Sequence, residues 1–115
     1  MSDLKADLPQ GTLDMLILRV VASGPIHGYA IAQRIHGISQ AVLQVQQGSL
    51  YPALHRLENR RLLKAEWRAS ETGRDAKFYR LTPKGRKELE AEQKHWDHLR
   101  DAIERIMRGA EGEVL

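Results

Sequence analysis

The stretch QQGSLYPALHRLENRRLLKAEW, residues 46–67, begins with the periodicity of a helix and ends with that of a strand. Placed at 100° per residue, its apolar side chains up to residue 57 share one face of a helix, and its polar side chains share the other. The apolar face holds Leu50, Ala53, Leu54 and Leu57, and the polar face holds Tyr51, Pro52, His55, Arg56 and Asn59. We therefore expect a helix whose leucines enter a core while its polar side chains face outward.

The ends of this helix carry their own signals. Ser49 is a suitable N-cap, and Pro52 would then fall in the first turn, where its missing N–H costs nothing. The helix should run to about Arg60. Arg60 and Arg61 suit that end, because cations are favourable at a helix C-terminus.

A strand period follows directly. Side chains alternate from residue 63 to 69, with Leu63, Ala65, Trp67 and Ala69 on one face and Lys64, Glu66 and Arg68 on the other. Residues 78–82 form a second candidate strand, and the intervening SETGRDA is rich in turn residues. The pattern predicts a β-hairpin.

Two helices are expected upstream. The first spans about residues 12–23, is ended by Gly24-Pro25, and has the apolar stripe Leu13, Leu16, Ile17, Val20 and Val21. The second should end near Gly37, follows a turn at His27-Gly28, and is marked by Tyr29, Ile31, Ile35 and Ile38. Residues 39–47 form a polar connection. Three helices followed by a basic hairpin define a winged helix-turn-helix.

A long helix should follow Pro83 and run to about Arg108. Its apolar residues are spaced by seven or lie at the alternate heptad positions, with Glu92 as an interruption: Leu89, Trp96, Leu99, Ile103 and Ile106. A helix that protrudes from so small a domain has little core to cover, so we expect this seam to contact a second subunit. The predicted fold is mainly α with a small β-hairpin, a winged helix-turn-helix at 1–82 and a dimerisation helix with a short tail at 83–115, in one compact unit.

Composition limits the possible functions. The chain has 115 residues and no cysteine, which suits one domain and excludes disulfides, a thiolate nucleophile and Cys-based zinc sites. Neither a signal peptide nor a membrane-spanning segment is evident, so we expect a cytoplasmic protein with no membrane contact. No phosphate-binding glycine loop, nucleophile elbow or metal-ligand cluster is present. We therefore expect no enzyme activity and no cofactor.

Positive charge is concentrated in one part of the chain. Residues 56–87 contain eleven Lys or Arg against four Asp or Glu, a net of +7, whereas residues 1–55 are neutral and residues 88–115 have a net charge of −4. Such a distribution favours a polyanionic partner. A solvated basic face is the alternative interpretation.

The sequence resembles a known family. The stretches LPQGTLDMLILRVVASGPIHGYAIAQRI, GSLYPALHRLENRRLL and FYRLTPKGRKEL, between residues 8 and 89, are similar to the PadR family of bacterial transcriptional regulators in order and spacing. The short C-terminal part is similar to the subfamily with one terminal helix. The resemblance implies a homodimeric winged-helix repressor that binds double-stranded DNA. The wing departs from the family's usual Gly-x-Pro-Arg-Lys-Tyr-Tyr pattern, because Asp75 adds a negative charge at the expected tip.

The third helix would enter the major groove, and the wing would reach the adjacent backbone or minor groove. The residues expected to contact DNA are Gln46, Gln47, Ser49, Tyr51, Pro52, His55, Arg56, Arg74 and Lys77. Counterion release would drive this association and make it sensitive to salt. A dimer with recognition helices about 34 Å apart would read an inverted repeat.

Two features of the last helix have alternative interpretations. Trp96 is either a packing residue of the seam or one wall of a slot for a flat hydrophobic or aromatic small-molecule effector, as aromatic residues near the dimer centre are in similar regulators. His95 and His98 have the spacing of metal ligands, but no further ligand completes a site, so we expect surface exposure and no metal. A winged-helix adaptor that binds protein is the competing function, although it leaves the +7 segment unexplained.

Overall fold

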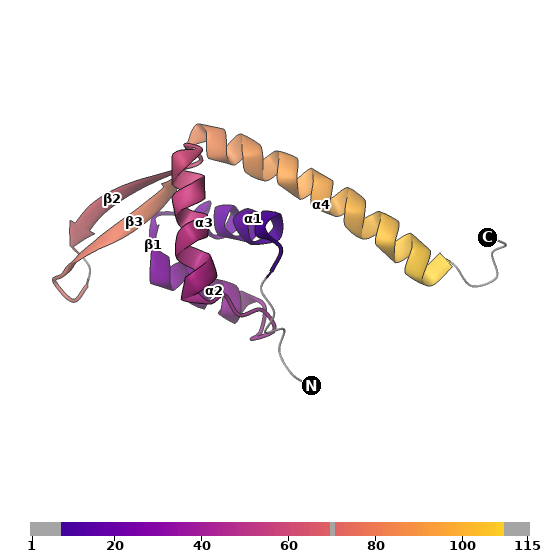
Figure 1. Ribbon diagram of the computed structural model, residues 1–115, viewed down its shortest axis with the longest axis horizontal. Coiled ribbons are helices and arrows are strands. Elements are labelled where there is room, and N and C mark those ends of the chain that lie inside the picture. Colours follow the sequence, from indigo (N-terminus) through magenta and orange to yellow (C-terminus); the bar gives the residue numbers. More distant parts are fainter. Residues whose placement is uncertain (1–7, 70, 110–115) are drawn as a thin grey trace.

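Four helices and three short strands follow one another in the computed structural model, which describes residues 8–69 and 71–109 (Figure 1). Their order and bounds are α1 Gln10–Val21, β1 Ile26–His27, α2 Gly28–Ile38, α3 Gln47–Asn59, β2 Leu63–Ala69, β3 Asp75–Leu81 and α4 Pro83–Gly109. Residues 1–7 and 110–115, which include the expected short tail, lie outside the described part, as does residue 70. The predicted winged helix-turn-helix with a long C-terminal helix is confirmed. No described helix is long and apolar enough to cross a bilayer.

One hydrophobic core joins α1, α2, α3 and the sheet. The apolar face predicted for α3 is buried throughout: Leu50, Ala53, Leu54 and Leu57 are at most 1 % exposed. In α1, Leu16 is only half-buried, whereas Leu18, which the predicted stripe omitted, is 1 % exposed. α1 packs against α2, α3 and α4, so its buried surface is wider than one apolar stripe.

A two-residue strand replaces the turn expected at His27-Gly28. Ile26 and His27 pair antiparallel with Tyr79 and Phe78 of β3, which makes a three-stranded sheet of order β1-β3-β2. His27 then becomes the N-cap of α2, since its Nδ1 accepts a hydrogen bond from the Ala30 N–H at 3.3 Å. The sequence pattern missed β1 because two residues are too few to show an alternation.

α3 begins earlier than the sequence predicted. Gln46, not Ser49, is the N-cap, because its carbonyl accepts from the Ser49 N–H at 3.0 Å and from the Leu50 N–H at 2.9 Å. Ser49 therefore lies in the first turn, and Pro52 lies inside the helix instead of at its start. At the other end, Arg61 has a φ of 63°, the left-handed conformation that commonly ends a helix.

The hairpin is longer than expected. β2 has the predicted bounds, but β3 begins at Asp75 and ends at Leu81, because the register continues outward until Ala69 pairs with Asp75. Asp75 is thus the first residue of a strand and not part of the turn. Only the inner end of the hairpin meets the core: Leu63 is buried and Trp67 is 68 % exposed.

The start of α4 is fixed to the domain. Thr82 caps the helix by accepting from the Gly85 N–H at 2.9 Å, while its hydroxyl donates to the Arg61 carbonyl at 2.7 Å. Gly85 faces the backbone so closely that a Cβ there would lie 2.1 Å from the Leu62 carbonyl oxygen. Beyond its first turns α4 passes α1 and extends away from the other elements, so that the molecule measures 63 Å along its longest axis (Figure 1).

Candidate nucleic-acid interface

The outward face of α3 is polar and accessible. Gln47, Tyr51, Pro52 and His55 are exposed, and Gln46 is exposed just before the helix. Ser49 is half-buried in the first turn. The structure therefore places the expected DNA-contacting residues of α3, apart from Ser49 and Arg56, on one accessible surface.

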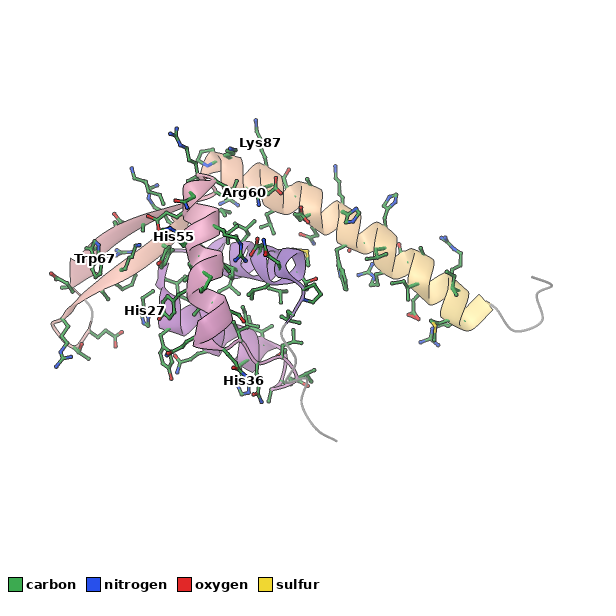
Figure 2. All side chains as sticks on the ribbon, in the orientation of Figure 1. His27, His36, His55, Arg60, Trp67 and Lys87 are labelled. Carbon is green, nitrogen blue, oxygen red and sulfur yellow. The ribbon has the colours of Figure 1, made fainter. Side chains whose placement is uncertain are left out.

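An open cavity of about 440 Å³ lies between α3, the start of α2 and the hairpin. We call it the wing cavity, and its lining includes His27, Gly28, Tyr29, Tyr51, His55, Glu58, Trp67, Ala76, Lys77 and Tyr79. Of these residues, Figure 2 labels His27, His55 and Trp67, which come from β1, α3 and β2. Sequence periodicity did not predict the cavity, because its walls come from segments up to 52 residues apart, from His27 to Tyr79.

Tyr51 forms part of the cavity wall by packing over Gly28. A Cβ on Gly28 would lie 3.0 Å from a ring carbon of Tyr51 and 3.3 Å from a methyl group of Leu54. The absence of a side chain at position 28 thus lets α3 approach α2. The Tyr51 ring has a structural role here, and its exposure of 44 % leaves it accessible for contact.

Lys77 is held inside the cavity by Glu58. Its Nζ donates to Oε1 of Glu58 at 3.2 Å and lies 5.5 Å from the centre of the Tyr79 ring. Partial burial disfavours the charged form of Lys77, but the hydrogen bond and the charge of Glu58 outweigh it, so the pKa of Lys77 lies above its ordinary value of 10.5. Burial raises the pKa of Tyr79, against the opposing charge of Lys77. At neutral pH Lys77 is therefore an ammonium and Tyr79 a neutral phenol.

Arg56 does not lie freely on the outward face, as the sequence suggested. Its Nη2 donates to Oδ1 of Asp14 in α1 at 3.0 Å, and its Nε is buried with no hydrogen-bond partner among the described residues. The reason is position: Arg56 lies at the edge of the polar face, where α1 packs against α3. This ion pair was not predicted, and through it the guanidinium of Arg56 links two helices of the domain.

The tip of the wing carries accessible aromatic and basic side chains. Arg74 is exposed in the turn, and Trp67 is exposed on the side of the hairpin that lines the wing cavity. Nearby, the Arg68 guanidinium lies 4.5 Å from the centre of the Phe78 ring. The rings of Phe78 and His27 meet edge to face, with their centres 5.6 Å apart. The alternation predicted only that Trp67 shares a strand face with Leu63, Ala65 and Ala69. The short core beneath the hairpin explains the exposure of Trp67, because none of the helices within residues 8–69 and 71–109 covers it.

The predicted seam of α4 divides into two parts. Leu89 is 7 % exposed and belongs to the protein's own core, so its assignment to a subunit contact is corrected. Trp96, Leu99, Ile103 and Ile106 are 40 to 67 % exposed. Trp96 also lines an open groove of about 270 Å³ with Met15, Leu16 and Arg19 of α1.

Metal ligands do not gather in the described part of the chain. His95 and His98 are both exposed on α4. No group of three His, Cys, Asp or Glu side chains within residues 8–69 and 71–109 is placed to hold a metal ion.

The three helices, the hairpin beside the accessible face of α3, and the projecting α4 form a winged-helix fold. Residues 17–91 match the transcriptional regulator PadR-like family, and the chain belongs to that family. It is a transcriptional regulator and not an enzyme. The expected family resemblance is thus confirmed.

Individual relatives agree with this assignment. The chain is 37 % identical over 83 residues to transcriptional regulator Rv3488 of Mycobacterium tuberculosis, a match that covers 72 % of this chain and 74 % of the relative. A PadR-like transcription factor of Bacteroides fragilis superposes with a TM-score of 0.69 at 34 % identity, covering 84 % of this chain and 91 % of that one. A PadR-like regulator of Bacillus cereus gives 0.75 at 25 % identity, with coverages of 86 % and 94 %.

Proposed function

We propose that this protein is a cytoplasmic homodimeric repressor that binds an inverted-repeat operator in double-stranded DNA. α3 would enter the major groove through Gln46, Gln47, Ser49, Tyr51, Pro52 and His55. Arg74 and Lys77 would bring the wing to the adjacent backbone. Arg56 would act indirectly, by holding α3 against α1 through Asp14.

The observation that carries this proposal is the wing cavity beside the outward face of α3. A duplex seated on α3 passes its sugar–phosphate backbone between the recognition helix and the wing. The cavity lies at that place, and it offers the ammonium of Lys77, the hydroxyl of Tyr51 and the imidazole of His55. Contacts of this kind position the protein on DNA, while the exposed first turn of α3 supplies contacts to base edges.

Dimerisation is supported by the exposed part of the α4 seam. Large apolar side chains on one face of a projecting helix are unfavourable in water, and a second copy of the same helix would cover them. We propose a seam of Trp96, Leu99, Ile103 and Ile106, without Leu89. One recognition helix reads too few base pairs for strong specificity, so the dimer is required for operator binding.

The test is binding to a fluorescent fragment of the gene's own upstream DNA. A Gln47→Ala/His55→Ala variant removes two exposed side chains of α3 that form no hydrogen bond within the described residues. We expect it to lose at least tenfold in affinity while its melting temperature stays unchanged. A Lys94→Ala/His98→Ala variant on α4 serves as the control and should bind like wild type. Equal binding by all three proteins would contradict the role of α3.

A small-molecule effector is a second proposal, favoured by the groove beside Trp96. It is open, about 270 Å³ in volume, and lined by both apolar and charged side chains. A flat hydrophobic or aromatic compound would fit such a site. The check is quenching of Trp96 fluorescence by planar aromatic dyes in a Trp67→Phe background, followed by release of DNA. A dye that leaves the Trp96 signal unchanged would exclude this site.

A further inference from the structure

A second basic surface lies away from the wing cavity. Three cations of the basic segment are paired with acids: Arg56 with Asp14, Arg60 with Glu88, and Lys77 with Glu58. Four others are exposed around the junction of β3 and α4, and none of them forms an ion pair within residues 8–69 and 71–109: Lys64, Arg80, Arg86 and Lys87. We call this set the junction surface.

The four side chains are brought together by the sheet register and by the start of α4. Lys64 and Arg80 are direct partners across β2 and β3, so their side chains share one face of the hairpin. Arg80, Arg86 and Lys87 line one open groove of about 590 Å³. The junction surface is therefore continuous from the hairpin to the helix.

The junction surface points away from the wing cavity. Successive residues of a strand face opposite sides, so Arg80 lies on the other face of β3 from Lys77 and Tyr79. Figure 2 places Lys87 at the start of α4, near Arg60 and at the opposite end of α3 from the first turn. The contacts of the junction surface are therefore separate from those that the first turn of α3 would make with a duplex.

Folding alone does not explain these cations. Lys64 and Arg80 lie directly opposite each other in the sheet. Like charges in such a pair are destabilising. Arg86 and Lys87 follow directly after the first turn of α4, and that turn contains no acid that could offset their charge. Arg86 and Glu90 are four residues apart, yet no ion pair joins them in the described chain. Departures from local folding preferences are expected at functional sites.

We propose that the junction surface binds the phosphate backbone of duplex DNA outside the half-site contacted by α3 and the wing. This inference rests on the proposed function, because a duplex already held by α3 is present near the junction surface at high effective concentration. Four cations outnumber the two acids that border them, Glu66 beside Lys64 and Glu90 in the groove. Release of counterions from DNA favours such contacts.

The experiment is hydroxyl-radical footprinting of the upstream fragment with full-length wild type and two double variants. Wild type should protect an operator core and also backbone positions that flank it. Arg86→Gln/Lys87→Gln should lose the flanking protection and keep the core. Between 50 and 200 mM salt the affinity of this variant should also fall roughly 150-fold less than that of wild type, because two lost phosphate contacts per protomer are four per dimer.

The matched control is Lys94→Gln/Arg105→Gln, which removes two exposed cations from the same helix and should leave the whole footprint unchanged. Lys64→Gln/Arg80→Gln tests the hairpin half of the surface independently of α4. Absence of flanking protection in wild type, or its persistence in both junction variants, would overturn the inference while the core protection upholds the proposed function. Absence of any protected core would instead refute the proposed function itself.

Discussion

α3 and the outer half of α4 have the same kind of apolar stripe, yet they differ in what covers it. In α3 the stripe is closed off by the domain, with Leu54 at 1 % exposure. In α4 the stripe stays open, with Ile106 at 67 %. The comparison teaches that periodicity predicts a buried face but not the partner that buries it.

The difference begins at Leu89. The first turns of α4 are fixed by Thr82 and Gly85 and bury Leu89 in the core, after which the helix passes the end of α1 (Figure 1). At Trp96 the helix still borders a groove shared with α1. The first turns of α4 thus belong to the core of the domain, and the outer part of the helix carries the proposed subunit contact.

The largest expected effect concerns the closed stripe of α3. Leu54→Ala should lower the free energy of unfolding by about 2–5 kcal/mol, since it removes a fully buried side chain and leaves a cavity. Urea unfolding measures this loss. The cost of Leu54→Ala should be independent of protein concentration, whereas that of Ile103→Ala in α4 should vanish in dilute solution. If both costs behave alike, the distinction between the two stripes is wrong.

Next is the open stripe of α4. Leu99→Asp/Ile103→Asp should weaken dimerisation at least about 100-fold, because two carboxylates would be buried at the subunit contact. Analytical ultracentrifugation measures the dissociation constant. Lys94→Asp/Arg105→Asp places two carboxylates on other faces of α4, removes two cations as well, and should remain dimeric. A variant that stays dimeric despite aspartates at 99 and 103 would place the contact elsewhere.

A glycine near the start of each helix sharpens the comparison. Gly85→Ala should destabilise by about 1–3 kcal/mol, because its Cβ would meet the Leu62 carbonyl oxygen. Gly48→Ala in α3 meets nothing within 4 Å, so helix propensity should stabilise it by up to about 1 kcal/mol. Thermal unfolding of the two variants should therefore shift in opposite directions. Two shifts of the same sign would contradict the close fit at the start of α4.

The smallest effect concerns Glu58, near the end of α3. Glu58→Gln should free Lys77 for a phosphate and raise DNA affinity by up to about tenfold, or 1.4 kcal/mol. Stability should change by less than about 1 kcal/mol, because the pair is about a third exposed. Glu88→Gln, which breaks the pair with Arg60, is the control and should leave affinity unchanged. Fluorescence anisotropy measures the DNA affinity of both variants. Weaker binding by Glu58→Gln would mean that Glu58 holds Lys77 in the position that favours DNA binding.

Much of the fold could be predicted because the spacing of apolar residues along the chain reflects the period of each helix or strand. The stripe of Leu50, Ala53, Leu54 and Leu57 follows from the helical period, and β2 follows from alternation. The extra strand β1 and the early start of α3 escaped prediction. β1 forms because Ile26 and His27 pair with β3, and α3 begins early because the Gln46 carbonyl accepts backbone hydrogen bonds.

The candidate site was predicted only in part, because its parts are distant in sequence. The polar face of α3 could be identified from its residues, but the pairing of Arg56 with Asp14 joins positions 42 residues apart. The same holds for Lys77 and Glu58, which meet only when the hairpin folds against α3.

By itself, the sequence determined the order of helices and strands, the apolar faces and the position of the basic segment, because these depend on near neighbours along the chain. Only the tertiary structure decided which cations are paired, where the wing cavity opens, and that Leu89 belongs to the core while Trp96 stays accessible. These outcomes depend on the packing of distant segments, and the period of a single helix or strand carries no information about its partner.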